Sequence, residues 1–326
     1  MNTNKVLESS LKVGSDNSVG ASCDTQTVSS ENNEAVALNL QRSATAEVQR
    51  PSTKPIKFVR PKRFLNISTF NIRTGREDWK IRELAQLMDQ FNISIVAIQE
   101  HRRVHKESVK YEQFDNHLLV TSSAIRNSAQ AAIGGVGFLL NKKAAAALCE
   151  VTSISGRVIQ ASFAGNPETT LISVYAPTNC RGNEDEAERF YDQLRDAIAQ
   201  TPQHNLLLVL GDFNAKISSV HVRYAHDKRT NENGKRLVDL SCEKSLIISN
   251  NNLLKKNSKR WSFEDPKGER YQLDYILINS KWKNSIMNVE PYSSFASVGS
   301  DHRIVTVKLR LSLRVPKTPP PKTRYD

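Results

Sequence analysis

The feature that most constrains the fold of this chain is a run of five apolar residues, 206–210, followed by Gly211-Asp212-Phe213-Asn214. The run is too short for a stable helix and ends in glycine, so it predicts a strand buried on both faces. In an extended segment, Asp212 and Asn214 would point to the same side. A carboxylate that deprotonates water, beside an amide that holds an oxyanion, is a hydrolase pairing. The alternative is an Asx-type turn that closes the strand, and the run alone leaves both interpretations open.

The charge of the chain favours a polyanionic partner. The 326 residues carry a formal net charge of +12, and the pI is near 9.5. Residues 1–55 contain five Lys and Arg against six Asp and Glu, so the positive excess lies in residues 56–326. Such a field suits nucleic acid first. No apolar run approaches the ~20 residues that span a bilayer, so we expect no membrane association.

The cysteines and the N-terminus indicate an intracellular protein. Four scattered cysteines lack the paired spacing of a zinc site, which is typical of a reducing compartment. The N-terminus has no apolar region of the kind found in a signal peptide. A basic stretch at residues 57–63 suggests a nuclear rather than a cytoplasmic location.

Composition divides the chain into three parts. Residues 1–59 are rich in small polar residues and cannot bury enough apolar surface to offset their ordering entropy, so we expect disorder. Residues 60–314 should form one large domain, close to the upper size of a single core. Residues 315–326 form an extended Pro- and Lys-rich tail.

Apolar periodicity in the large domain predicts more strands than helices. Helices are expected over residues 79–91, 184–200 and 234–244, with Asn183 as the cap of the second. Strands are expected at residues 64–70, 94–99, 118–121, 136–140, 158–163, 171–175, 206–210, 246–249, 261–263, 272–278 and 304–311. The economical arrangement is α/β: a two-sheet β-sandwich flanked by helices.

Polar residues recur where these strands end, in positions where a sheet can hold a side chain rigidly at its rim. They are Asn71, Glu100, Tyr175, Asp212, Asn214, Asp274, Asp301 and His302. Each alone could be a turn or a paired charge. Together they indicate a site for a hard cation with an acid/base pair.

The blocks around these residues resemble the endonuclease/exonuclease/phosphatase superfamily, which has the deoxyribonuclease-I-like fold. The blocks, in the order of that family, are 69–71 (Thr-Phe-Asn), 98–100 (Ile-Gln-Glu), 174–177 (Val-Tyr-Ala-Pro), 211–214 (Gly-Asp-Phe-Asn), 272–276 (Gln-Leu-Asp-Tyr-Ile) and 299–302 (Gly-Ser-Asp-His). They span residues 64–311 and are most similar to endonuclease domains of LINE-type non-LTR retrotransposons and to craniofacial-development-protein-like relatives. The resemblance implies a four-layer α/β sandwich with a catalytic domain at residues 60–314.

The resemblance also implies roles for the strand-end residues. Glu100 would be the main ligand of Mg²⁺, or of Mn²⁺, with Asn71 and Asp301 beside it. Asp212 would deprotonate the attacking water. Asn214 and Tyr175 would hold a phosphate oxygen. His302, oriented by Asp274, would bind the phosphate as imidazolium.

A basic strip is expected to contact the substrate. Lys255, Lys256, Lys259 and Arg260 lead to Trp261, and in a nuclease such a strip can bind phosphates. The histidines outside the blocks, including His101, lie in polar sequence and are expected to be exposed and without a role.

The expected function is that of a monomeric Mg²⁺-dependent DNA endonuclease that nicks one strand. Arg73 stands where some apurinic endonucleases have an acid, and Thr178 where some relatives have Asn, so the pattern favours a retrotransposon-type enzyme over an apurinic one. A LINE origin also implies a reverse transcriptase, which these residues do not contain. Two alternatives are a phosphoesterase acting on a lipid or nucleotide phosphate and a copy that binds nucleic acid or a partner without cleaving it.

Overall fold

The structure is a computed structural model that describes residues 46–47, 57–60, 62–127 and 129–311. Most of the segment expected to be disordered, residues 1–59, and the tail at 315–326 lie outside the described residues. Two residues of that segment, Phe58 and Val59, are buried, and the Phe58 ring packs against Phe163 with centroids 5.2 Å apart. None of the helices in the described ranges is long and apolar enough to cross a membrane.

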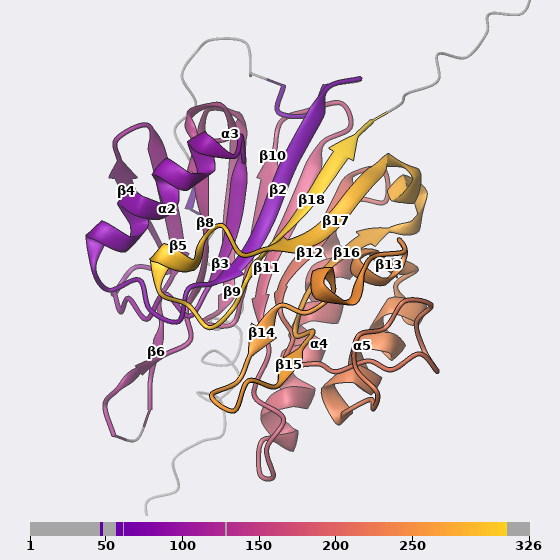
Figure 1. Ribbon diagram of the computed structural model, residues 1–326. Helices are drawn as coiled ribbons and strands as arrows, with labels where there is room; N and C mark the ends of the chain where they lie inside the picture. The colour runs from indigo at the N-terminus through magenta and orange to yellow at the C-terminus, as the bar shows by residue number, and fades with distance from the viewer. Residues whose placement is uncertain (1–45, 48–56, 61, 128, 312–326) are drawn as a thin grey trace, which may run out of the picture. The chain divides into compact units, whose positions relative to one another are not determined.

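Two seven-stranded mixed sheets form the centre of the fold (Figure 1). The first sheet is ordered β1 (Ala46–Glu47), β9 (Leu148–Ser155), β10 (Val158–Phe163), β11 (Thr169–Tyr175), β12 (Leu206–Asp212), β16 (Asp274–Asn279) and β13 (Leu246–Ile248). The second is ordered β17 (Ile286–Tyr292), β18 (Ile304–Arg310), β2 (Phe64–Asn71), β3 (Ile95–Gln99), β8 (Val136–Asn141), β5 (His117–Ser122) and β4 (Val109–Phe114). Among the described strands, β2/β3 and β11/β12 pair in parallel and the other neighbours are antiparallel.

The sheets face each other across one core, and helices cover their outer faces. Helix α2 (Asp78–Gln90) packs on the second sheet, and α4 (Glu184–Gln200) and α5 (Glu232–Glu243) pack on the first (Figure 1). A short helix, α3 (Lys142–Ala147), follows β8. The expected two-sheet sandwich flanked by helices is therefore confirmed.

The position of strand β12 between two apolar layers explains why residues 206–210 are all apolar. Leu206, Leu208 and Leu210 point into the core between the sheets, whereas Leu207 and Val209 pack against the helix layer. The five residues 206–210 are buried, as the sequence predicted, and the strand continues beyond them through Gly211 to Asp212, which are also buried.

Helix α4 has the predicted bounds but not the predicted cap. The side chain of Asn183 makes no capping hydrogen bond, and its Nδ2 donates to the carbonyl and hydroxyl oxygens of Thr178. Three acidic residues in the first turn instead place negative charge at the positive end of the helix dipole.

Several strands escaped the sequence analysis. β4 and β9 expose the polar residues Gln113 and Glu150, whereas β17 exposes Met287 and Tyr292. Two short hairpins, β6 (Ile125–Arg126) with β7 (Ala132–Ile133) and β14 (Phe263–Glu264) with β15 (Arg270–Tyr271), have only two residues per strand. Of the strand expected at residues 261–263, only Phe263 lies in a strand, as the first residue of β14. Pairing with neighbouring strands, which the local sequence does not reveal, makes these segments extended.

Candidate active site

Strand pairing brings the expected blocks to one edge of the two sheets. Asn71 pairs with Gln99 at the ends of β2 and β3, so Glu100 follows directly beside Asn71. Tyr175 pairs with Asp212 at the ends of β11 and β12, and Asp212 also pairs with Asp274 at the start of β16. Because β2 contacts β12, the two groups of residues meet across the core.

Asp212 serves the turn and the site at once. Its Oδ1 accepts a hydrogen bond from the backbone N–H of Asn214 at 2.9 Å, which is the Asx turn that the sequence left open. Its Oδ2 accepts from Asn71 Nδ2 at 3.0 Å and lies 3.8 Å from His302 Nε2. The hydrolase and turn interpretations are therefore compatible, because each uses a different oxygen.

Asn214 does not continue the extended strand. Its φ is 47°, in the left-handed region, so the expectation that its side chain shares a side with Asp212 by strand alternation is wrong. Its Nδ2 donates to the carbonyl of Ala176 at 2.9 Å. In this geometry the Asn214 amide holds the loop after β11 in place.

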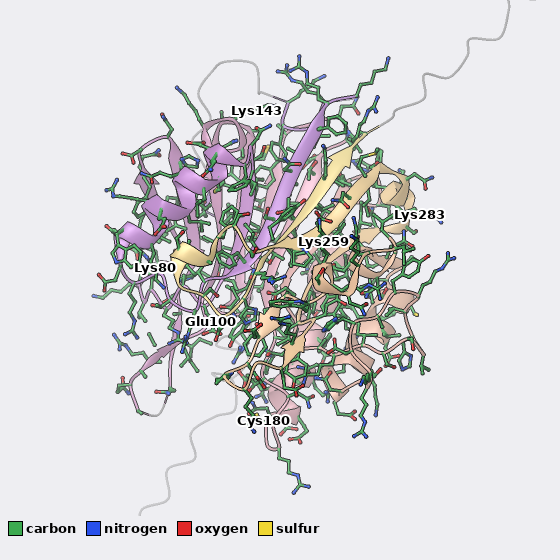
Figure 2. All side chains as sticks on the ribbon, viewed as in Figure 1. Lys80, Glu100, Lys143, Cys180, Lys259 and Lys283 are labelled. Carbon is green, nitrogen blue, oxygen red and sulfur yellow. The ribbon has the colours of Figure 1, made fainter. Side chains whose placement is uncertain are left out.

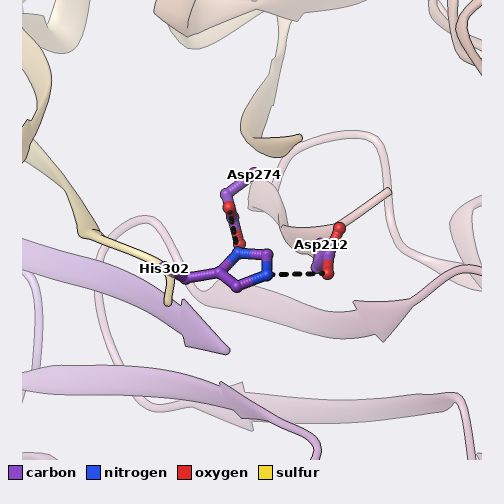
Figure 3. A group of neighbouring side chains, drawn as sticks. All are labelled: Asp212, Asp274 and His302. Atoms are coloured by element: carbon purple, nitrogen blue, oxygen red, sulfur yellow. Dashed lines mark hydrogen bonds and ion pairs between the residues drawn. The ribbon is translucent and has the colours of Figure 1, made fainter. Parts of the chain in front are cut away.

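His302 lies between two buried carboxylates (Figure 3). Its Nδ1 is 2.8 Å from Asp274 Oδ2, while Nε2 faces Asp212. The ring of Phe263 packs against the imidazole with centroids 4.9 Å apart. The imidazole is thereby fixed in orientation, with Nε2 directed into the site.

These contacts change the acid–base behaviour of both partners. Burial lowers the pKa of His302, but the charge and hydrogen bond of Asp274, helped by Asp212, raise it to about 9. Burial and the neighbouring Asp274 raise the pKa of Asp212 to about 7, against the opposing effect of His302. Near pH 8 the pair therefore favours a carboxylate at Asp212 beside an imidazolium at His302.

Glu100 lies next to this triad. Its Oε1 accepts from Asn71 Nδ2 at 3.1 Å and its Oε2 from Arg102 Nη2 at 2.6 Å. Burial raises the pKa of Glu100, but hydrogen bonds from Arg102, Asn71 and Tyr175 outweigh burial and leave it below its ordinary value. Burial and the charge of Glu100 raise the pKa of Tyr175, so its hydroxyl keeps its proton and donates.

Asn71 joins the two halves of the site through one amide group. Its Nδ2 donates to both Glu100 and Asp212, and its Oδ1 accepts from the backbone N–H of Arg73 at 2.9 Å. The amide oxygen, which is the side-chain atom of Asn71 that could ligate a cation, is thus engaged by the backbone of Arg73, and the amide nitrogen is the atom that faces Glu100. In this geometry Asn71 positions the carboxylates.

Asp301 is exposed, unlike the other acids expected at the strand ends. Its carboxylate lies 4.0 Å from Arg73 Nε, with 37% of the side chain exposed. The neighbouring Ser300 fixes the backbone here, because its Oγ donates to the carbonyl of Asn71 at 2.6 Å and accepts from the N–H of His302. Asp301 therefore lies on the rim above the buried triad.

Two groups of side chains could be considered for a cation. Asp212, Asp274 and His302 have ligand atoms within 4.8 Å of one another. However, an imidazolium carries protons on both nitrogens and cannot ligate, so this group fits proton transfer better. Glu100 offers an ionised oxygen donor with 16% of its side chain exposed, which leaves room for water ligands. That arrangement fits Mg²⁺, which keeps several waters.

The basic strip is not gathered at this site. Lys255 and Lys259 are both ion-paired with the buried Glu290, at 3.3 and 3.2 Å, and Lys259 lies over β17, away from Glu100 (Figure 2). Arg260 donates to the carbonyl oxygens of Lys255 and Ala225. These three cations are thus tied to the protein itself.

The remaining two residues of the strip differ from each other. Lys256 is exposed, whereas Trp261 is buried. The guanidinium carbons of Arg303 and Arg270 lie 3.2 and 4.5 Å from the centroid of the Trp261 ring. Arg303 directly follows His302 in the chain. The contact of Trp261 with Arg303 therefore holds a positive charge close to His302.

The sequence analysis gave no role to two residues near the site, Gln99 and Arg102, and was wrong about the exposure of a third, His101. Arg102 pairs with Glu100, and Gln99 donates to Ser173 across the two sheets at 3.1 Å. His101, expected to be exposed, is fully buried, because its ring packs against the backbone of Gly135 and its Nδ1 accepts from the N–H of Arg103. The only signal in the sequence was adjacency to Glu100.

The fold and the site together define a class of protein. Residues 68–302 match the Endonuclease/Exonuclease/phosphatase family, and the chain belongs to this family. Among curated proteins it is similar to craniofacial development protein 2 of Tragulus javanicus, with 30% identity over 263 residues that cover 78% of this chain and 44% of the relative. The protein of the same name from Bos taurus matches equally well, with 43% of its length covered. The chain therefore spans less than half the length of these relatives.

Solved structures share the fold at low identity. The AP endonuclease LMAP of Leishmania major has a TM-score of 0.61 at 15% identity, covering 86% of this chain and 99% of that one. A Neisseria 3′ phosphatase bound to a product DNA hairpin has a TM-score of 0.59 at 15% identity, covering 76% and 100%. The endonuclease domain of TRAS1, a telomere-specific non-LTR retrotransposon, has a TM-score of 0.53 at 17% identity, covering 77% and 100%. At these identities the likeness concerns the fold.

Proposed function

We propose that this chain is a Mg²⁺-dependent DNA endonuclease that nicks one strand of a duplex. The observation that carries the proposal is the buried triad of Asp212, His302 and Asp274, linked through the Asn71 amide to the carboxylate of Glu100. Hydrolysis of a phosphodiester uses a base, a cationic hydrogen-bond donor and a hard-cation ligand at short range.

Each residue has a task that its geometry permits. Asp212 would accept a proton from the attacking water, since its pKa of about 7 matches neutral conditions. The imidazolium of His302, held by Asp274, would donate to a non-bridging phosphate oxygen and offset the developing charge. Tyr175 would add a second donor near Glu100. A Mg²⁺ or Mn²⁺ ion bound at Glu100 would supply Lewis-acid stabilisation of the same charge.

DNA is the substrate that the charge and the relatives favour. The chain carries a net charge of +12, and the solved structures with this fold include a retrotransposon endonuclease domain and an enzyme bound to a DNA hairpin. We extend the proposal to a retrotransposon origin, a nuclear location and a monomeric state, with residues 60–314 as the catalytic domain. Size-exclusion chromatography with light scattering and imaging of a tagged chain test the state and the location.

Nicking of supercoiled plasmid by the full chain tests the proposed function. We expect relaxation with Mg²⁺ and none with EDTA, and a loss of at least about 100-fold in Asp212→Asn and in His302→Ala. Asp239→Asn, an equal charge change at an exposed position of α5, should keep full activity. A folded wild-type chain that binds DNA but never nicks it would point to the binding-only alternative. Activity on lipid or nucleotide phosphates without DNA cleavage would point to the phosphoesterase.

A further inference from the structure

The carboxylate of Glu100 is already engaged by a cation of the protein itself. Arg102 Nη2 lies 2.6 Å from Glu100 Oε2, and 36% of the Arg102 side chain is exposed. The Nε of Arg102 is buried without a hydrogen-bond partner. The Arg102 guanidinium is therefore held through Nη2, by the Oε2 atom of Glu100. The cation proposed to bind Glu100 would use the same carboxylate.

The backbone on either side of this pair is fixed in an uncommon conformation. Glu100 and Arg102 have φ values of 55° and 56°, in the left-handed region. The N–H of Arg102 donates to the carbonyl of Gly134 at 3.0 Å, and that of His101 to Gly135 at 3.4 Å. The loop is thus anchored to the base of the β6/β7 hairpin, whereas the Arg102 guanidinium is held by its contact with Glu100.

Arg102 also lines an open hollow next to the site. The hollow has a volume of about 590 Å³, and the described residues that line it include no acid. Its cationic lining consists of Arg76, Arg102, Arg103, Lys110 and Arg126. Arg103 is paired with both Asp78 and Glu112, and Lys110 also pairs with Glu112, so Arg76, Arg102 and Arg126 carry most of the charge of the lining. A strand of phosphates would fit such a lining, whereas a divalent cation would be repelled by it.

We propose that Arg102 is a latch that exchanges Glu100 for the phosphate backbone of DNA when a divalent cation binds. Without the cation, Arg102 neutralises Glu100. With it, two positive groups would compete for one carboxylate at a separation of a few ångströms, where their repulsion is strong. Arg102 then turns to the adjacent hollow and donates to a phosphate outside the cleaved bond. The proposal rests on the proposed function and adds a coupling between cation and DNA.

The exchange makes two equilibria depend on each other. Because the cation must displace Arg102, its affinity for the DNA-free protein is held down. DNA that accepts Arg102 in the hollow removes this competition, so DNA and the cation each tighten the binding of the other. Competition from Arg102 would thus keep the DNA-free protein from binding the cation tightly.

The test measures Mn²⁺ binding to the full chain by the loss of the free-ion paramagnetic resonance signal, without DNA. We expect Arg102→Gln to bind Mn²⁺ about tenfold more tightly than wild type, because the competing charge is gone. Arg102→Lys, which keeps the charge, should stay within about twofold of wild type. The matched control is Arg76→Gln, which makes the same charge change in the same hollow. Among the described residues Arg76 forms no ion pair, so this change releases no carboxylate. It should change the affinity less than about twofold.

The second readout is the affinity for a labelled DNA duplex in the uncleaving Asp212→Asn background. Arg102→Gln should weaken DNA binding by about tenfold with Mn²⁺, but by less than about twofold in EDTA, where Arg102 is held by Glu100. Equal Mn²⁺ affinities of wild type and Arg102→Gln, or an equal loss of DNA affinity with and without Mn²⁺, would overturn the latch and leave the nuclease proposal intact. Absence of Mn²⁺ binding in every variant would overturn both.

Discussion

Replacing Asp274 with Asn should move the whole pH profile of nicking to lower pH. The carboxylate of Asp274 is fully buried, and its Oδ2 lies 2.8 Å from His302 Nδ1. It is the largest influence that raises the pKa of His302, and it also raises the pKa of Asp212. Removing one charge therefore acts on both reacting groups in the same direction.

The size of the effect follows from the displacement of the His302 pKa. In the intact site this pKa stands at about 9 rather than 6.5, although burial acts against the charged form. At 1.36 kcal/mol per unit, the net preference for imidazolium is about 3 kcal/mol. Without Asp274, burial remains and the main opposing charge is lost, so the pKa of His302 should fall to its ordinary value or below it. The pKa of Asp212 should fall from about 7 as well.

The direction of the change follows from the forms that act. In the proposed mechanism Asp212 is ionised and His302 is protonated, so activity should rise as pH passes about 7 and fall as pH passes about 9. In Asp274→Asn the rise and the fall both shift to lower pH. At pH 8 the protonated fraction of His302 alone should drop roughly thirtyfold if its pKa returns to 6.5.

The assay is the initial rate of plasmid nicking from about pH 5 to about pH 10 at constant ionic strength and Mg²⁺ concentration. Asp239→Asn is the matched control, because the same charge change at an exposed position of α5 should leave the profile in place. If Asp274→Asn loses activity but keeps the wild-type falling limb, Asp274 does not hold the proton on His302. That result would refute the assigned roles.

Two further predictions concern packing and the loop of the site. Leu208→Ala should lower the free energy of unfolding in urea by about 3 kcal/mol because Leu208 fills the core between the sheets, while Leu254→Ala, at a position 71% exposed, should cost under about 0.5 kcal/mol. Similar losses in the two variants would contradict the placement of β12. Gly135→Ala combines a φ of +85° with a Cβ only 2.6 Å from the His101 ring, so it should cost about 2 kcal/mol more than Gly182→Ala, whose φ is +90° but whose Cβ meets no atom within 4 Å. An equal loss in urea unfolding would show that the His101 contact adds nothing.

The sequence alone determined the strands that carry the site and the order in which they carry it. The continuous apolar run of β12, the bounds of α4 and the two-sheet class with outer helices all follow from local composition and periodicity. The turn after β12 could also be predicted, since Asp and Asn favour such turns. The sequence did not show that Asp212 uses one carboxylate oxygen in the turn and the other in the site.

Only the tertiary structure decided which partner each polar side chain takes. The amide of Asn71 between Glu100 and Asp212 depends on the packing of two sheets against each other. Lys255, which the sequence analysis expected to contact the substrate, forms an ion pair with Glu290.

The physical reason is the range of the interactions. Backbone preference and hydrophobic periodicity act over a few residues, so elements and their ends can be read along the chain. Hydrogen bonds and ion pairs join residues as far apart in sequence as Asn71 and Asp212. The orientation of an amide or the choice between two carboxylates depends on a difference of about 1 kcal/mol, which exists only once the chain has folded.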